Sequence, residues 1–99
     1  MKRLKYKEIL KLAQMLLNNG IPFEMKDMWN GKGIAYPSIK ECVCSVIEHD
    51  YSYGHEQDLL EIKGLLSADE AFDGEQVVGY LNADEVFHRI RTDWYCRTI

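Results

Sequence analysis

The chain has 99 residues, of which 46% are hydrophobic and 28% are charged. This length and balance predict a single globular domain over residues 1–99 and exclude wholesale disorder. No apolar run reaches the roughly 20 residues needed to cross a bilayer, and the basic segment from Met1 to Lys11 lacks the apolar stretch of a secretory signal. The three cysteines are a poor basis for disulfides, which favours a reducing compartment. We therefore expect a cytoplasmic location without a membrane partner.

The net charge of −4 conceals an uneven distribution along the chain. Residues 1–20 carry a net charge of +4, whereas residues 41–85 contain twelve carboxylates and one lysine, Lys63. Nucleic acids are bound through basic surfaces, so the acidic middle of the chain argues against direct nucleic-acid binding. The same carboxylates leave open a role as a counter-defence protein that occupies the basic groove of a host nucleic-acid-binding enzyme.

Hydrophobic residues at spacings of three and four predict a helix within the first twenty residues. Its apolar face is expected to consist of Tyr6, Ile9, Leu10, Ala13, Leu16 and Leu17. Gly20 is expected to follow the end of the helix, because glycine readily takes the left-handed conformation at that position.

The hydrophobic period changes to two after residue 20, which predicts strands. Residues 21–26 alternate between apolar and polar and are expected to form the first strand. The sequence Trp29-Asn30-Gly31 predicts a tight turn in which the Asn-Gly pair takes positive φ angles. A return strand through residues 34–36 and a third, well-covered strand over residues 41–49 complete a three-stranded antiparallel meander.

Helical signals return after residue 54. Leu59, Leu60 and Ile62 predict a helix that begins near His55 and ends at Gly64. Residues 67–70 and 82–85 have the capping-box spacing, so each predicts the start of a helix. The second of these helices is expected to be longer, with one face formed by Val86, Phe87, Ile90 and Trp94.

Residues 77–81, between the two capping boxes, are expected to be a connector or an edge strand. The predicted fold class is therefore α+β, in the order α-β-β-β-α-α. It comprises a helix, a three-stranded antiparallel meander, and two to three helices packed on one face of the sheet.

Polar and aromatic side chains are concentrated between the third strand and the helix expected after it. The candidate residues for contact with a ligand or partner are His49, Tyr51, Ser52, Tyr53, Gly54, His55 and Glu56. A helix start can bind an anion such as a nucleotide phosphate, with the tyrosines stacking on a ring and Ser52 and His55 hydrogen-bonding to polar groups. The structural alternative is that Ser52 or Asp50 caps the helix and the tyrosines cover the edge of the core.

Catalytic and metal-binding patterns are weak in this sequence. Cys42 and Cys44 fall within a regular strand, whereas structural zinc sites present cysteines around a tight turn, so we expect no metal and no cofactor. Pairings of Cys44 with His49, or of Glu48 with Glu56, are conceivable, but no nucleophile, phosphate-loop or metalloprotease motif accompanies them. We assign no catalytic residue, and the sequence favours a binding role over an enzymatic one.

Several motifs resemble those of small proteins, without assigned activity, from Gram-positive prophages and conjugative elements. These motifs are Trp29-Asn30-Gly31, Cys44-Ser45-Val46-Ile47-Glu48-His49, Ser52-Tyr53-Gly54-x-Glu56, Leu59-Leu60-Glu61-Ile62-x-Gly64-Leu65-Leu66 and Val78-Gly79-Tyr80-Leu81-x-Ala83-x-Glu85-Val86-Phe87. The resemblance implies a mobile-element origin and transfers no catalytic residue. It favours a non-enzymatic binding module whose partner is a protein of the host or of the element. We expect the contact surface at residues 51–56 and the acidic helix next to them.

Overall fold

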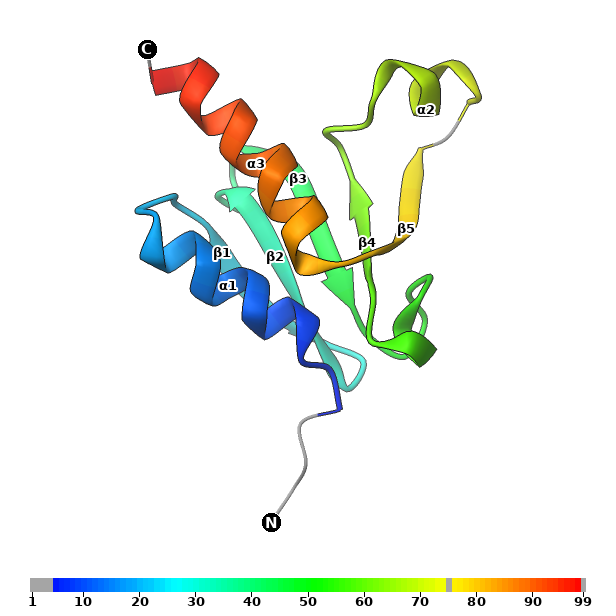
Figure 1. Cartoon of the computed structure of the whole chain (residues 1–99). Coiled ribbons are helices and arrows are strands. Elements are labelled where there is room, and N and C mark those ends of the chain that lie inside the picture. Colours follow the sequence, from blue (N-terminus) through cyan, green and yellow to red (C-terminus); the bar gives the residue numbers. More distant parts are fainter. Residues whose placement is uncertain (1–4, 75, 99) are drawn as a thin grey trace.

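The computed structural model describes residues 5–74 and 76–98. Its elements in chain order are α1 (Glu8–Asn18), β1 (Glu24–Met28), β2 (Gly31–Pro37), β3 (Cys42–Glu48), the 3-10 turn η1 (His55–Gln57), β4 (Leu60–Lys63), α2 (Ala68–Phe72), β5 (Val77–Leu81) and α3 (Ala83–Thr98). The five strands form one antiparallel sheet in the order β1-β2-β3-β4-β5. Helices α1 and α3 lie side by side on one face of this sheet (Figure 1). The α+β class is confirmed.

The core lies between the sheet and the two long helices. Its strand residues are Ile34, Tyr36, Cys44, Val46, Leu60, Ile62 and Leu81, and α3 adds Ala83, Val86 and Ile90. Helix α1 buries Ile9, Leu12, Ala13 and Leu16, whereas Leu17 is exposed, so the predicted helical face is displaced slightly from the observed one. Gly20 has a φ of +67° just past this helix, as predicted. Burial of these side chains is the main favourable contribution to folding.

The β1–β2 turn has the predicted place but a different register. The positive φ angles belong to Trp29 (37°) and Asn30 (63°), and Gly31 is the first residue of β2. Gly31 is required for a different reason. A Cβ atom at this position would lie 2.0 Å from the carbonyl oxygen of Glu48, so only glycine lets β2 approach the end of β3 this closely.

The predicted helix from His55 to Gly64 is wrong, and the sheet has five strands rather than three. Helical geometry lasts only for η1, since the next residue, Asp58, takes a left-handed conformation with a φ of 55°. Leu60 and Ile62 are buried while Lys63 is exposed, which is the alternation of a strand. The resulting strand β4 pairs with residues 77–81, so the edge-strand alternative for that segment is correct.

Both predicted capping boxes are present and start the two remaining helices. The Ser67 hydroxyl accepts a hydrogen bond from the Glu70 amide, and the Glu70 carboxylate accepts one from the Ser67 amide. Asn82 and Glu85 exchange the equivalent bonds at the start of α3. These local signals could be recognised in the sequence because all their partners lie within four residues.

Candidate functional site: the loop between β3 and β4

The loop formed by residues 49–58 lies at the end of β3, beside the β1–β2 turn and the start of α1. Its conformation is fixed by a buried serine. The Ser52 hydroxyl accepts a hydrogen bond from the His49 amide and donates one to the His49 carbonyl, each at 3.0 Å. Gly54 then turns the chain with a φ of 94°. Alternate residues of the loop are therefore directed inward and outward: Ser52 and Gly54 are buried, and Tyr51 and Tyr53 are exposed.

Two carboxylates near this loop bind the first amides of α1. Asp58 accepts hydrogen bonds from the backbone amides of Lys7 at 2.9 Å and Glu8 at 3.1 Å. Glu48, at the end of β3, accepts one from the Ile9 amide at 3.0 Å. The start of a helix leaves such amides without partners and carries a partial positive charge, which carboxylates stabilise. The anion-binding capacity of this terminus is therefore used within the protein itself.

Glu48 is fully buried, with 0% of its surface exposed. Burial raises its pKa to about 8, and the neighbouring Asp58 carboxylate acts in the same direction. Among the described residues, its Oε2 atom has no hydrogen-bond partner, so nothing compensates at this oxygen for the cost of burying a charge. Burial alone would raise the pKa of Asp58, but the neighbouring Glu48 carboxyl and the hydrogen bonds from the two helix amides hold it below its usual value.

Asp50 organises a second polar cluster on the rim of the loop. Its carboxylate accepts hydrogen bonds from Lys5 at 2.6 Å, from Asn30 at 2.9 Å and from the Tyr6 hydroxyl. These bonds, that of Lys5 foremost, hold the pKa of Asp50 well below its usual range. The Tyr6 hydroxyl also lies 3.3 Å from Nδ1 of His55. Burial, followed by the bond to Asp50, raises the pKa of Tyr6, so this phenol remains protonated and acts as a donor.

Two exposed rings and one buried ring form an aromatic corner, which consists of Trp29, Tyr51 and His49. The ring centroids lie 5.0 Å apart for Trp29 and His49, and 6.0 Å apart for Trp29 and Tyr51, all in edge-to-face arrangements. The Tyr51 amide donates to Nδ1 of His49, which fixes the orientation of the His49 ring. His49 is buried, whereas Trp29 is 61% and Tyr51 is 77% exposed. Two large apolar rings are thus held in place in solvent.

Tyr53 continues the exposed aromatic surface toward β5. Its amide donates to Glu61 on β4 at 2.9 Å, and its side chain lies over Gly79 on β5. A Cβ atom on Gly79 would lie 2.4 Å from the Cβ of Tyr53, so the loop contacts the strand without space between them. Tyr53 is 60% exposed and Tyr80 is 57% exposed. The loop therefore joins the aromatic corner to the edge of the sheet.

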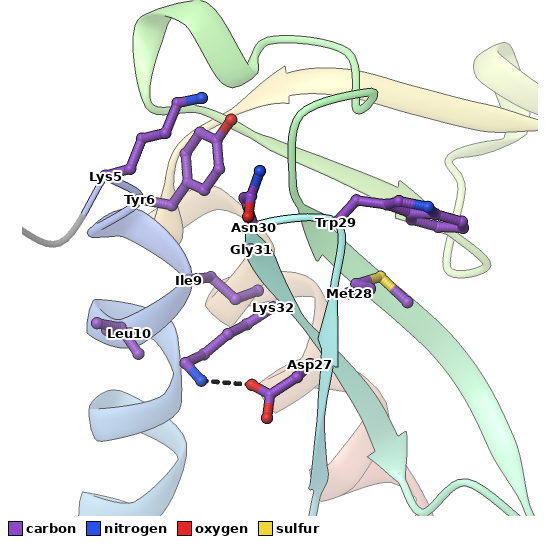
Figure 2. A pocket seen from close by; sticks show the side chains of 10 residues that line it. All are labelled: Lys5, Tyr6, Ile9, Leu10, Asp27, Met28, Trp29, Asn30, Gly31 and Lys32. Atoms are coloured by element: carbon purple, nitrogen blue, oxygen red, sulfur yellow. Dashed lines mark hydrogen bonds and ion pairs between the residues drawn. The ribbon is translucent and has the colours of Figure 1, made fainter.

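A cleft of about 510 Å³ lies between the start of α1 and the β1–β2 hairpin. Figure 2 shows Ile9 and Leu10 on its helical wall, while the Trp29 side chain extends away from α1. The two lysines at the cleft are already paired, Lys5 with Asp50 and Lys32 with Asp27, each at 2.6 Å. Because each lysine is already neutralised by a carboxylate of the protein, the electrostatics of this cleft do not favour an anionic ligand such as a phosphate.

The structure places the seven predicted site residues on one loop but gives them different surroundings. The exposed members are Tyr51, Tyr53 and Glu56, the partly buried one is His55, and the buried ones are His49, Ser52 and Gly54. Because η1 has three residues, the expected helix start and its anion site are absent from this loop, and neither Ser52 nor Asp50 caps a helix. The acidic helix expected beside the loop is instead strand β4.

No metal centre is formed by the residues that the structure describes, since they contain no group of three or more His, Cys, Asp or Glu side chains able to hold an ion. Cys42 is exposed at the start of β3 and Cys44 is buried in the core. Burial raises the pKa of Cys44 to about 12, so this thiol is a poor nucleophile. Helices long and apolar enough to cross a membrane are likewise absent from residues 5–74 and 76–98.

Comparisons with family models, curated proteins and solved structures found no match to this chain.

Sequence reasoning missed several residues of the site. Trp29 was interpreted only as part of a turn, yet a tryptophan at the tip of a hairpin has few neighbours that could bury it, and this was an available signal. Tyr80 was not singled out either, because its exposure depends on its place at the edge of the sheet. The hydrogen bonds that Asp58 and Glu48 accept from α1 leave no local signal in the sequence, since they connect positions 39 to 51 residues apart.

Proposed function

We propose that this protein is a non-enzymatic binding module that recognises another protein through the aromatic corner and Tyr53. The observation that carries the proposal is the mutual packing of Trp29 and Tyr51 while each remains more than half exposed. Tryptophan and tyrosine contribute disproportionately to protein interfaces, because their rings bury large areas and lose little conformational freedom. Exposed apolar side chains that are held in a defined geometry are typical of such contact sites.

The supporting loop adds to the case for binding. Ser52, Asp50 and Asp58 each make hydrogen bonds that restrain the loop, so little further ordering is required when a partner binds. The groups that could perform acid–base chemistry are instead used to hold the fold: Tyr6, Asp50, Glu48 and Asp58 are bonded to one another or to helix amides. The proposed origin in a phage or related element makes a host or element-encoded protein the expected partner.

Affinity capture with matched variants tests this proposal. The wild-type protein, Trp29→Ser, Tyr51→Ser and a control, Tyr95→Ser, are immobilised and exposed to an extract of Gram-positive cells. Tyr95 is 48% exposed but lies on α3, so its loss removes a ring from a different surface. We expect proteins that are retained by the wild type and the control and lost from both corner variants. Retention of the same proteins by all four forms would show that the corner is not the contact surface.

A further inference from the structure

The two edges of the sheet differ in their protection against an additional strand. Strand β1, at one edge, has three charged residues among its five: Glu24, Lys26 and Asp27. Strand β5, at the other edge, has the sequence Val-Val-Gly-Tyr-Leu and no charged residue. Natural proteins protect edge strands with charges because exposed backbone amides and carbonyls pair readily with other chains. Within the described residues β5 has a neighbouring strand on one side only, and it lacks this protection.

A groove of about 490 Å³ lies against this strand. It is lined by four consecutive residues of β5, Val77 to Tyr80, together with Tyr53 of the loop and Glu70 of α2. Tyr53 packs directly against Gly79, and a Cβ atom on Gly54 would lie 3.1 Å from the backbone of Tyr80. These two close contacts hold the loop in a fixed position where it meets β5. An extended chain laid here would find backbone hydrogen-bonding groups, an apolar floor and two partly exposed rings.

The charge around β5 restricts what can occupy the groove. Residues 64–81 contain four carboxylates and neither lysine nor arginine. Arg89 of α3 pairs with one of these carboxylates, Glu70, and Lys63 of β4 lies opposite Val77. Two of these carboxylates, Asp69 and Asp73, are exposed and belong to the α2 region, which lies close to the start of β5 in Figure 1. A second copy of this chain, paired edge to edge, would add the carboxylates of its own α2 region to an edge that is already acidic and would supply no opposite charge. A basic segment of a different protein has the complementary charge.

We propose that β5 accepts an extended, basic segment of the partner protein as a sixth strand of the sheet. This inference rests on the proposed binding function and specifies how the partner is engaged. Backbone hydrogen bonds to β5 hold the segment, its apolar residues contact Val77 and Val78, and its basic residues face the acidic α2 region. Tyr53 and Tyr80 contact the segment where it reaches the loop, and the aromatic corner binds the folded part of the partner.

A peptide of eight residues that alternates valine and lysine serves as the probe. It is titrated into isotope-labelled protein, and chemical shifts and amide exchange are recorded by NMR. We expect shift changes and slowed exchange centred on Val77 and Val78, since Tyr80 has a left-handed φ of 62° and the loop contacts Gly79. We also expect at least about tenfold weaker binding when alternate peptide amides are methylated and cannot donate hydrogen bonds. No binding, equal binding of the methylated peptide, or changes centred on β1 would each overturn the proposal.

Charge reversal on the protein tests the basic character of the occupant. In Asp69→Lys/Asp73→Lys, two exposed side chains change sign, and we expect at least about fivefold weaker peptide binding, with the difference reduced by added salt. Unchanged affinity, or dimerisation of the wild-type protein through β5 in native mass spectrometry, contradicts a basic partner strand. If capture depends on Trp29 and Tyr51 but β5 does not respond, the strand proposal fails and the binding function stands. If the peptide binds β5 but the corner variants capture the same proteins, the proposed contact surface fails instead.

Discussion

The inward and outward sides of the loop from His49 to Asp58 use their side chains differently. On the inward side, Ser52 and Asp58 bond to backbone amides, and Asp50 on the rim bonds to three side chains. On the outward side, Tyr51 and Tyr53 leave more than half of their surface in solvent. The residue types that most suggested ligand chemistry in the sequence are satisfied inside the protein. The surface available to a partner is therefore mainly aromatic, and stability and binding should be separable by mutation.

The largest loss of stability is expected for Gly31→Val, at the junction that supports the loop. Its Cβ would lie 2.0 Å from the Glu48 carbonyl and 2.6 Å from the Cα of His49, both backbone atoms that cannot move aside easily. We expect a loss of about 3 kcal/mol or more in the free energy of unfolding, measured by urea denaturation. Gly33→Ala is the control, since its Cβ would meet its nearest neighbour, the flexible Met28 side chain, at 3.4 Å. A loss of comparable size in both variants would contradict this account of Gly31.

Asp58→Ala is expected to cost about 1–2 kcal/mol, because the amides of Lys7 and Glu8 lose their acceptor at the start of α1. Asp58→Asn should lose less, since its amide oxygen still accepts and asparagine tolerates the left-handed conformation. The outward control, Glu56→Ala, should remain within about 0.5 kcal/mol of the wild type in thermal or urea denaturation. An equal loss in the free energy of unfolding for Glu56→Ala and Asp58→Ala would contradict the assignment of Asp58 to a stabilising inward side and of Glu56 to the outward side.

The buried carboxyl of Glu48 predicts a dependence of stability on pH. Its pKa is about 8 in the folded protein and near the ordinary 4.5 when unfolded, so the folded state retains a proton that the unfolded state has lost between these values. The stabilisation is complete below about pH 4.5 and decreases as the pH rises toward 8. We expect the free energy of unfolding to fall by about 1 kcal/mol or more between about pH 5 and pH 8.

Glu48→Gln isolates this contribution, because glutamine resembles the protonated carboxyl and does not titrate. Its free energy of unfolding should change less with pH over that range than that of the wild type. Glu41→Gln, at an exposed position just before β3, should leave the wild-type pH dependence unchanged. A Glu48→Gln variant that retains the full pH dependence would assign the effect to another group.

The smallest effect on stability is expected for Tyr51→Ser on the outward side. Tyr51 is 77% exposed, so its removal should change the free energy of unfolding by less than about 0.5 kcal/mol. The adjacent Ser52→Ala should lose about 1–2 kcal/mol, because the buried amide and carbonyl of His49 both lose a partner. Denaturation of the two variants compares neighbouring residues on opposite sides of the loop, and a reversed order would mean that the sides are wrongly assigned.

Much of the fold could be predicted because its signals are local. The α1 periodicity, the β1-β2-β3 meander and both capping boxes depend on residues close together in the chain. Strand β4 was predicted as a helix because Leu59, Leu60 and Ile62 fit both periods, and only pairing with β3 and β5 selects the strand. The break after β3 could be predicted, but not the helix expected from His55, since only the turn η1 forms there. The inward and outward sides of the loop depend on Ser52 bonding back to His49 and on distant α1.

Binding and stability measured together on the double variant Trp29→Ser/Tyr51→Ser test the central claim most directly. The partner recovered by affinity capture is titrated against this variant and the wild type, and both proteins are also denatured with urea. We expect affinity to fall by about a hundredfold or more while the free energy of unfolding changes by less than about 1 kcal/mol. An affinity equal to that of the wild type, or a loss of binding that accompanies unfolding of the variant, would contradict the assignment of partner recognition to the aromatic corner.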